Sequence, residues 1–493
     1  MIRTLLLLCG LAIAGFAVAQ NAVDPPALPT PDDKEVWLAV RLDQRHVGHM
    51  VWRRSAHEDR VETSTEMQIG LLRGSQALRV LATESSIETA KGEPLEFSSA
   101  FETLGSTSAV RGVRRADGRF DVSLVSGGRE ETRIIDWPQG ALLSEGQRLE
   151  HLASRSRVGE HRHAKVFDPS SLQVLEVDTT LAGAVTLDLP DGAVEAMHVR
   201  QQLGRDGGGV QLENWVDSAF GFPLRLRMPA LGLMLELEAC PKACATADPE
   251  LADVFRNTVV DSPRPLSTRD RRGNLEFDIA VRDGPTGALD QVPGQDILEQ
   301  DSGRVRLRVL RQGSTESAPT AQDTAAARWV QSDEDSVRSF AAEAVAGVEQ
   351  PMRRMQALEK AVRRRIATKS LRIGYASAVE VLQINEGDCT EHAVLLAAAA
   401  RALGIPARVV TGIAYAPEFS GRNDVFVPHA WVIAWVDGAW HGFDAALPRF
   451  DATHIGMTAG DGDPFDFYSG AELLGNLSIL AVDRAGRASE AAR

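Results

Sequence analysis

Residues 387–410 read GDCTEHAVLLAAAARALGIPARVV, and the interpretation of the C-terminal part of the chain starts from them. Asp388 is a good helix N-cap residue. The apolar residues that follow recur at the 3.6-residue spacing of an amphipathic helix. Gly404 stands where a C′ glycine belongs, and Pro406 comes shortly after it. The stretch therefore predicts a helix that ends before Gly404 and carries Cys389 in its first turn.

The first turn of a helix changes the chemistry of a thiol. Backbone N–H groups and the helix dipole favour the thiolate of Cys389, which is the nucleophilic form. The same N–H groups can help to hold an oxyanion. Asp388 and Glu391 act against thiolate formation, so an ionised Cys389 depends on a nearby imidazolium. Glu391 either sets the electrostatics of this site or only complements the positive helix end. A small buried helix residue remains the alternative for Cys389.

A second stretch, HAWVIAWVDGAWHGFD at residues 429–444, predicts a β-hairpin with Asp437-Gly438 as its two-residue turn. That turn places Trp431 opposite Asp444. His429 and Trp431 point to the same side because side chains alternate along a strand. His429 and Asp444 are therefore expected as diagonal neighbours on one face. A base that is oriented by a carboxylate is what a thiol nucleophile needs.

Other histidines are weaker candidates for the base. The hairpin places His441 on the opposite face. His392 is three residues after Cys389, but no carboxylate is positioned to orient it, so we interpret it as a packing residue of the first turn. His454 follows Asp451 in a predicted loop, and its role is left open.

Taken in order along the chain, these motifs resemble the successive signatures of the transglutaminase-like superfamily. The matching segments are Gly387–Ala393, Arg401–Val410, His429-Ala430-Trp431, Trp440, Asp444 and Asp451–Ile455. The resemblance covers residues 325–485. It implies a papain-like fold with Cys389 as nucleophile, His429 as base and acid, and Asp444 as orienting group. It also implies chemistry through a thioester formed on an amide.

Two more residues are candidates for oxyanion or substrate contacts. Gln383 lies six residues before Cys389, a spacing similar to that of papain-like thiol proteases, although a polar residue on a helix surface is the favoured alternative. Trp431 could line an acyl-binding groove together with Trp435 and Trp440. Those last two face each other in the hairpin, which favours a stabilising cross-strand pair. The expected thiol chemistry needs no metal or other cofactor. The calcium dependence of some animal relatives is not expected either, because the sequence has no Asp-, Asn- and Gly-containing loop of the required spacing.

The N-terminus predicts export. Arg3, the apolar run Leu5–Phe16 and the small residues Ala17-Val18-Ala19 form a signal peptide over 1–19, with an uncleaved anchor as the alternative. No later stretch is apolar enough to span a bilayer. The expected location is periplasmic or secreted. A net charge of -15 argues against nucleic acid as a partner.

The cysteine pattern agrees with an oxidising compartment. Cleavage of the signal peptide removes Cys9 and leaves three cysteines. Cys240 and Cys244 are four residues apart, and a local disulfide between them is a reasonable expectation outside the cytosol. Cys389 then stays outside that bridge. A thiol of this kind in an exported protein is either buried or reactive.

The chain of 493 residues predicts a multidomain protein. Period-two alternation and Asp-Gly turns indicate an N-terminal antiparallel all-β region. Within it, Val210–Glu238 is similar to the curved half-barrels of periplasmic lipoprotein-carrier-like proteins, with a plain β spacer as the alternative. An α+β, papain-like domain follows at the C-terminus. The expected division is a flexible leader at 20–34, a β domain at 35–245, a second β-rich segment at 250–311, a linker at 312–324, the transglutaminase-like domain at 325–485 and a tail at 486–493.

These features predict an exported thiol enzyme that acts on amide or peptide bonds of a protein or peptide substrate. Hydrolysis is favoured over cross-linking, because water is abundant and no amine site is recognisable. The alternative is a catalytically silent binding or assembly protein whose β domain engages a cell-envelope partner. In a third hypothesis the β domain binds a lipid or glycan and delivers the thiol domain to its substrate.

Overall fold

The structure is a computed structural model. It describes residues 33–73, 76–103, 106–126, 129–153, 158–205, 208–230, 233–253, 258–282, 289, 292–301, 303–311, 313–369, 375–463 and 473–485. The predicted signal peptide and the C-terminal tail lie outside these residues. The contacts of the chain divide it into two compact units. The first takes most of the chain up to Ala252, and the second takes the chain from Asp253 onward together with two short segments of the earlier part. Among the described helices, none is both long and apolar enough to cross a membrane.

The first unit is built on one large sheet of sixteen described strands. Its order runs from β8 back to β1, then to β15 and back to β9, with β16 added beside β3. The strands are β1 (Asp33–Leu42), β2 (Arg45–His57), β3 (Arg60–Arg73), β4 (Gln76–Thr89), β5 (Pro94–Thr103), β6 (Ser106–Arg114), β7 (Phe120–Ser126), β8 (Arg129–Ile135), β9 (Ala141–Leu142), β10 (His161–Asp168), β11 (Gln173–Leu189), β12 (Gly192–Arg205), β13 (Gly208–Asp217), β14 (Pro223–Ala230), β15 (Leu233–Ala239) and β16 (Ala252–Asp253).

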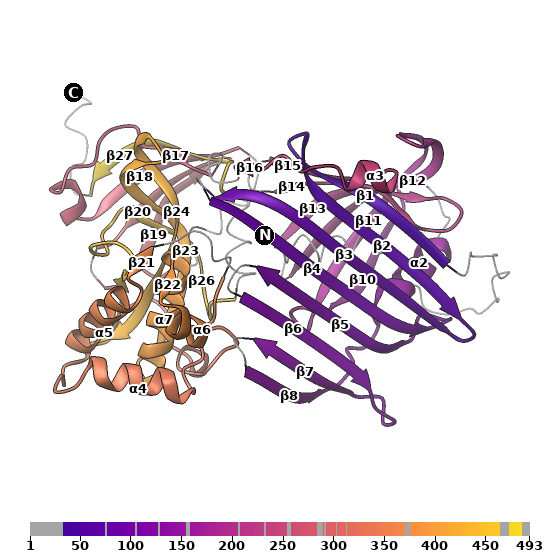
Figure 1. The fold of residues 1–493 in the computed structure, drawn as a ribbon. Coiled ribbons are helices and arrows are strands. Elements are labelled where there is room, and N and C mark those ends of the chain that lie inside the picture. The colour runs from indigo at the N-terminus through magenta and orange to yellow at the C-terminus, as the bar shows by residue number, and fades with distance from the viewer. Residues whose placement is uncertain are drawn as a thin grey trace. The chain divides into compact units, whose positions relative to one another are not determined.

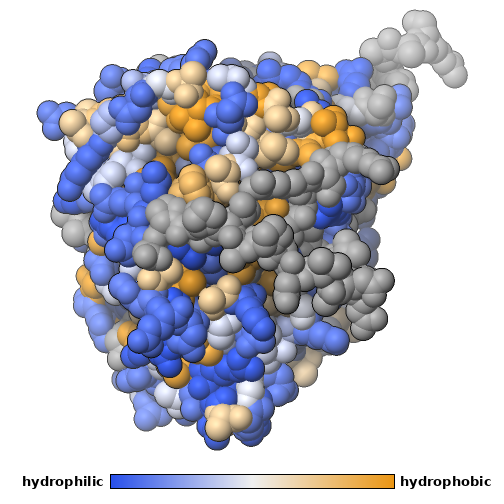
Figure 2. All heavy atoms as spheres, turned by 90° about the vertical axis from the view of Figure 1, so that its right-hand side faces the viewer, coloured by the Kyte–Doolittle hydropathy of each residue, from blue (hydrophilic) through white to orange (hydrophobic). Residues whose placement is uncertain are grey.

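The period-two pattern predicted for this region is confirmed along β3. Its alternate residues from Val61 to Ile69 are all buried. Neighbouring strands pair antiparallel, as between β2 and β3 or β11 and β12, and β9 pairs parallel with β10. The N-terminal region is therefore the antiparallel β structure that the sequence predicts. Charged and polar side chains cover much of the face shown in Figure 2, with smaller hydrophobic groups between them.

The sheet of the first unit curves enough for distant strands to share a core. Phe97 of β5 lies 5.6 Å from Phe120 of β7 and 5.1 Å from Phe167 of β10, measured between ring centroids. Gly112 of β6 gives the Phe97 ring its room, because a Cβ there would lie 2.1 Å from the ring. Figure 1 shows the long strands β1 to β8 as one twisted layer, with the paler strands drawn behind it.

A helix packs against the inner face of this sheet. Helix α2 (Ser144–Ala153) is held at its N-terminus by Glu88 of β4, which accepts from the N–H groups of Glu145 and Gly146 at 2.6 and 2.9 Å. Glu145 also binds Arg54 of β2 and Arg148, and these three side chains are nearly inaccessible to solvent. The core of the first unit therefore contains a buried charged cluster as well as apolar residues.

A short disulfide closes the first unit. Cys240 and Cys244 are bonded across the one-turn helix α3 (Lys242–Ala245). The bridge predicted from their spacing is present.

The second unit contains two sheets and the main helices. One sheet is formed by β17 (Val260–Asp261), β24 (Arg422–Val436), β23 (Ala407–Phe419) and β26 (His454–Gly460), with β25 (Ala439–Phe443) beside β24. The other has the order β19 (Gln295–Asp301), β20 (Arg304–Val309), β18 (Leu275–Val281) and β27 (Leu477–Arg484), and a two-strand pair joins β21 (Thr368–Lys369) to β22 (Glu386–Gly387). The helices are α4 (Asp335–Ala344), α5 (Pro351–Arg365), α6 (Ala378–Ile384) and α7 (Cys389–Ala402).

Helix α7 lies at the centre of this unit. It packs on β24 and β23, while α4, α5 and α6 contact its other sides, and Figure 1 shows the four helices as one group beside these strands. All of its residues from Thr390 to Arg401 are buried. The sequence predicted an apolar stripe on one face. The helix is buried all round instead, because its run of alanines lets neighbours approach from every side.

The expected internal boundaries of the C-terminal half differ from the structure. Residues 250–311 do not stand apart, since β17 pairs with β24 and β18 pairs with β27 near the end of the chain. The region 312–324 is not a simple linker either. Ser314 and Trp440 exchange two backbone hydrogen bonds, and Asp323 forms an ion pair with Arg408. Strand β1 also begins at Asp33, inside the expected leader.

Candidate active site

The hairpin β24–β25 has the predicted register. Val432 pairs with Phe443, and Val436 pairs with Ala439 across the Asp437-Gly438 turn. His429 and Asp444 consequently meet on one face, and the His429 Nε2 lies 2.8 Å from Asp444 Oδ2. Because a carboxylate only accepts, the imidazole donates this bond. The donated proton is on Nε2, so Nδ1 is the nitrogen left to accept a proton in the neutral ring.

Asp444 is fully buried, with four hydrogen bonds to its carboxylate. Oδ1 accepts from the N–H groups of Ala446 and Leu447 at 2.7 and 2.8 Å. Oδ2 accepts from His429 and from His454, whose Nε2 lies 3.0 Å away. Burial alone raises the pKa of the Asp444 carboxyl, but the two imidazoles outweigh burial and hold that pKa well below its usual range. Asp444 is therefore ionised whenever the site is folded near neutral pH.

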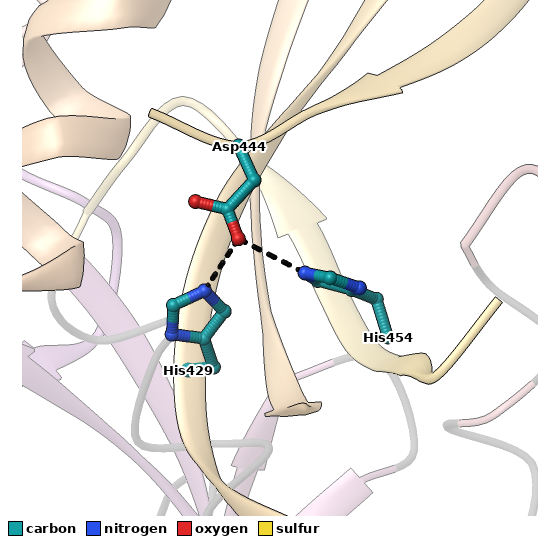
Figure 3. Close-up of side chains that lie close together, drawn as sticks. All are labelled: His429, Asp444 and His454. Carbon is teal, nitrogen blue, oxygen red and sulfur yellow. Dashed lines mark hydrogen bonds and ion pairs between the residues drawn. The ribbon is translucent and has the colours of Figure 1, made fainter. Parts of the chain in front are cut away.

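The sequence did not assign the role of His454. It begins strand β26, which pairs with β23, and Figure 3 shows its ring converging with that of His429 on the same carboxylate oxygen. The Asp451–His454 spacing was visible in the sequence. The contact with Asp444 was not, because it depends on the pairing of β26 with β23 and not on local spacing.

The N-terminus of α7 is tightly organised around Cys389. Asp388 caps the helix and accepts from the N–H of Thr390 at 2.8 Å. Glu391 accepts from the N–H of Asp388 at 2.8 Å and from the N–H of Ala376 at 3.1 Å. Glu391 thus completes a capping box and also ties α7 to the residues just before α6. Gly387 is required at this point, since a Cβ there would lie 2.5 Å from the Glu391 side chain.

Cys389 is the first residue of α7 and is half-buried. It packs against the core cluster that includes Ala430 and Ala445, the residues that directly follow His429 and Asp444. Since α7 packs on β24, the helix that begins with Cys389 and the strand that carries His429 are in direct contact. The side chain of Ala430 points to the opposite face of β24 from that of His429, which stacks on Trp431, so this packing joins the helix to the strand and does not itself bring the thiol to the imidazole.

The other candidates lie as follows. Trp431 is buried and stacks on His429, with ring centroids 6.2 Å apart, and meets His454 edge-on at 5.1 Å. It therefore packs against the two imidazoles. Gln383 is exposed near the end of α6. Trp435 and Trp440 form the expected cross-strand pair, with ring centroids 5.6 Å apart.

His392 is buried in the first turn of α7, and its Nδ1 lies 2.5 Å from the backbone oxygen of Asp388. Burial lowers the pKa of His392, so this ring is neutral near neutral pH. The packing interpretation agrees with this position.

The side chains of His429, Asp444 and His454 carry atoms of the kinds that bind metals. Their ligand atoms all lie within 4.8 Å of one another. The Nε2 atoms of the two histidines, however, both lie at hydrogen-bond distance from the same oxygen of Asp444. We therefore interpret these contacts as hydrogen bonds from the two imidazoles to Asp444, and the proposed reaction does not use a metal.

Residues 338–445 match the family model of the transglutaminase-like superfamily. The second unit thus contains a transglutaminase-like domain, and the match ends one residue beyond Asp444. Members of this superfamily are typically cysteine peptidases or acyltransferases. The domain therefore supports a thiol enzyme in general.

Solved structures with similarity to the chain come from several bacteria. One is a candidate cysteine protease from Cytophaga hutchinsonii, 18% identical, covering 43% of this chain and 87% of its own, with a TM-score of 0.28. Another is a β-barrel-like protein of a domain of unknown function from Brucella abortus, 12% identical, covering 42% and 94%, with a TM-score of 0.35. A third is a candidate exported protein with a YmcC-like fold from Bacteroides fragilis, 9% identical, covering 43% and 94%, with a TM-score of 0.18. Among curated protein sequences, no significant match exists.

Proposed function

We propose that this chain is an exported thiol enzyme that cleaves amide or peptide bonds through a thioester on Cys389. The observation that carries the proposal is the buried hydrogen bond between His429 and Asp444, on the strand against which the helix of Cys389 packs. A buried carboxylate that orients an imidazole, and a thiol in the first turn of a helix of the same domain, are the residue types that a nucleophile, base and orienter triad requires.

In the proposed reaction the thiolate of Cys389 attacks the carbonyl carbon of the amide. His429 takes the thiol proton and gives it to the departing amine, so that the C–N bond breaks as the C–S bond is retained. Asp444 holds the imidazole in the tautomer with its proton on Nε2. Water then attacks the thioester, His429 removes a proton from the water, and the acid and the free thiol result.

We propose water as the acceptor of the acyl group because water is abundant and because the sequence has no recognisable site for an amine. Transamidation uses the same thioester and differs only in the second nucleophile. The substrate class proposed is a protein or peptide.

Export is part of the proposal. The N-terminal signature of residues 1–19 predicts it. The Cys240–Cys244 disulfide supports it, because such bridges persist in oxidising compartments and are rare in the cytosol.

A catalytically silent binding protein is the second candidate, and one observation bears on it. The first unit has a groove of about 950 Å³ lined mainly by charged and amide side chains, among them Asp178, Arg200, Gln202, Gln211, Glu213 and Glu236. Leu212, Met228, Pro229 and Met234 also line it, so the groove offers both polar and apolar surface to an envelope partner.

The test is the rate at which iodoacetamide alkylates Cys389 as a function of pH, followed by peptide mass mapping. Wild type is compared with His429→Ala, and with His441→Ala as a control on the opposite face of the same hairpin. An ordinary thiol titrates near a pKa of about 8.5. The proposal predicts fast alkylation well below that pH in wild type and His441→Ala, and its loss in His429→Ala. Ordinary thiol behaviour in all three proteins would exclude the enzyme and favour the binding protein.

A further inference from the structure

His454 is a buried ionisable group of the candidate site, and the proposed reaction does not use it. Only 2% of its surface is exposed. Its Nε2 lies 3.0 Å from Asp444 Oδ2, and its Nδ1 lies 2.9 Å from the backbone oxygen of Asp451. Each ring nitrogen therefore faces an oxygen acceptor. A neutral imidazole has one N–H to donate, whereas an imidazolium has two.

A competing contact at Nδ1 is weaker. The backbone N–H of Asp451 also approaches Nδ1, but at 3.4 Å. The Asp451 carboxylate lies 3.7 Å from the same nitrogen. The backbone oxygen of Asp451 is closer to Nδ1 than the backbone N–H is, and a carboxylate oxygen of Asp451 also lies nearby. These oxygens favour a proton on Nδ1. Together with the proton that Asp444 requires on Nε2, this makes His454 an imidazolium.

The charges around His454 agree with that assignment. The charged groups near it or its partners include His429 on β24, Asp444 after β25, Asp451 before β26, and Arg271, whose Nη1 lies 3.9 Å from Asp451 Oδ2. On α5, Glu359 and Arg363 also lie near Asp444, and they form an ion pair with each other. With His429 neutral, the two carboxylates are balanced by His454 and Arg271. Although burial lowers it, the bonds to Asp444 and Asp451 raise the pKa of His454 to about 9.

This balance solves a problem for the proposed reaction. His429 has to alternate between its neutral and charged forms, and a fully buried carboxylate without a charged partner is strongly destabilised. A second imidazolium on Oδ2 keeps Asp444 compensated in both forms. The ring of His454 is itself fixed by Phe450 and Trp431, whose centroids lie 4.7 and 5.1 Å from it.

We propose, on the basis of the proposed function, that His454 is a positioning residue whose imidazolium holds Asp444 ionised and correctly oriented toward His429. It acts through Asp444 and does not touch the substrate.

The first measurement is the protonation state of His454 in the full chain, by NMR of ¹⁵N-labelled histidine side chains at about pH 7.5. The signals of His454 are assigned by their absence in His454→Gln. The inference predicts two N–H protons on this ring. A ring with only one would overturn it, whatever the activity of Cys389.

The second measurement is the alkylation rate of Cys389 as a function of pH in two variants. Cooperative unfolding of each variant shows first that it is folded. His454→Gln keeps a donor for Asp444 but removes the charge, so His429 alone compensates the carboxylate. The pH above which the thiolate–imidazolium pair is lost should then rise by about one unit, because a neighbouring positive charge is gone. His454→Phe removes donor and charge, and the alkylation rate near neutral pH should fall by about tenfold. His441→Gln is the control and should match wild type. Folded variants with the wild-type profile would refute the positioning role.

The two proposals fail in different ways. An ordinary thiol profile in wild type, with a doubly protonated His454, would refute the enzyme and the positioning role but establish the charged His454–Asp444 pair. A reactive thiolate in wild type, with a singly protonated His454, would overturn this inference alone.

Discussion

Arg363 of α5 donates from Nη2 to the backbone oxygen of Asp444 at 2.8 Å. The same guanidinium donates to the backbone oxygens of Ala445 at 3.1 Å and Leu447 at 2.7 Å. The segment that carries the candidate orienting carboxylate is thus fixed through its main chain by a helix, and through its side chain by two imidazoles.

Replacing Arg363 by alanine should loosen this segment, because three carbonyl groups lose their charged donor. We expect a loss of about 1–3 kcal/mol in the free energy of unfolding. The alkylation rate of Cys389 near neutral pH should fall by about tenfold, since a small displacement of a catalytic group is costly. Urea denaturation and peptide mapping measure the two effects.

The control for this prediction is Arg364→Ala. Arg364 is the next residue of the same helix, and its side chain is exposed. It should change neither stability nor alkylation appreciably. Equal effects of the two substitutions would show that the loss reflects helix charge and not the clamp on Asp444.

The contact between His429 and Asp444 could be predicted from the sequence because it is local. A two-residue turn fixes the register of a hairpin, and side-chain alternation then fixes which residues share a face. The N-cap of α7 was predictable for the same reason, since Asp388 and Glu391 lie within one turn of each other. Short-range geometry leaves few alternatives.

The contacts of His454 and Arg363 with Asp444 could not be predicted from local sequence. His454 reaches Asp444 only because β26 pairs with β23, on the other side of β23 from β24. Arg363 reaches it across 81 residues of sequence. Strand β18 likewise belongs to the second unit through its pairing with β27 near the end of the chain, and no local sequence pattern predicts a pairing between such distant segments. A Ser- and Pro-rich composition at 312–324 gave no sign of the bonds between Ser314 and Trp440.

The buried cluster of Arg54, Glu145 and Arg148 should dominate the stability of the first unit. Glu145→Gln leaves two buried guanidinium groups without a counter-charge, which should cost roughly 3–5 kcal/mol. The matched control is Glu35→Gln at the exposed Arg53–Glu35 pair, where the two side chains are 42% and 46% exposed. That substitution should cost less than about 1 kcal/mol. Chemical denaturation followed by tryptophan fluorescence compares them, and similar losses would contradict the prediction.

The disulfide should stabilise the first unit only modestly, because Cys240 and Cys244 close a very short loop. The chain-entropy relation gives about 2 kcal/mol for a loop of this length. The double substitution Cys240→Ser with Cys244→Ser should show that loss in thermal or urea unfolding, while the alkylation rate of Cys389 stays at the wild-type value. A changed rate would mean that the bridge affects the thiol site.

The raised pKa of His454 predicts how stability depends on pH. A histidine whose pKa is raised on folding stabilises the protein fully below its unfolded pKa, which is about 6.5. That contribution is lost as the pH rises through the folded value of about 9. Relative to His454→Gln, wild type should therefore lose on the order of 3 kcal/mol of its advantage between these limits. Urea midpoints measured across this range test it, with the exposed His57→Gln as the control that should run parallel to wild type. A gap between wild type and His454→Gln that stays constant with pH would mean that His454 is neutral, and that Asp444 depends on His429 alone for its charge.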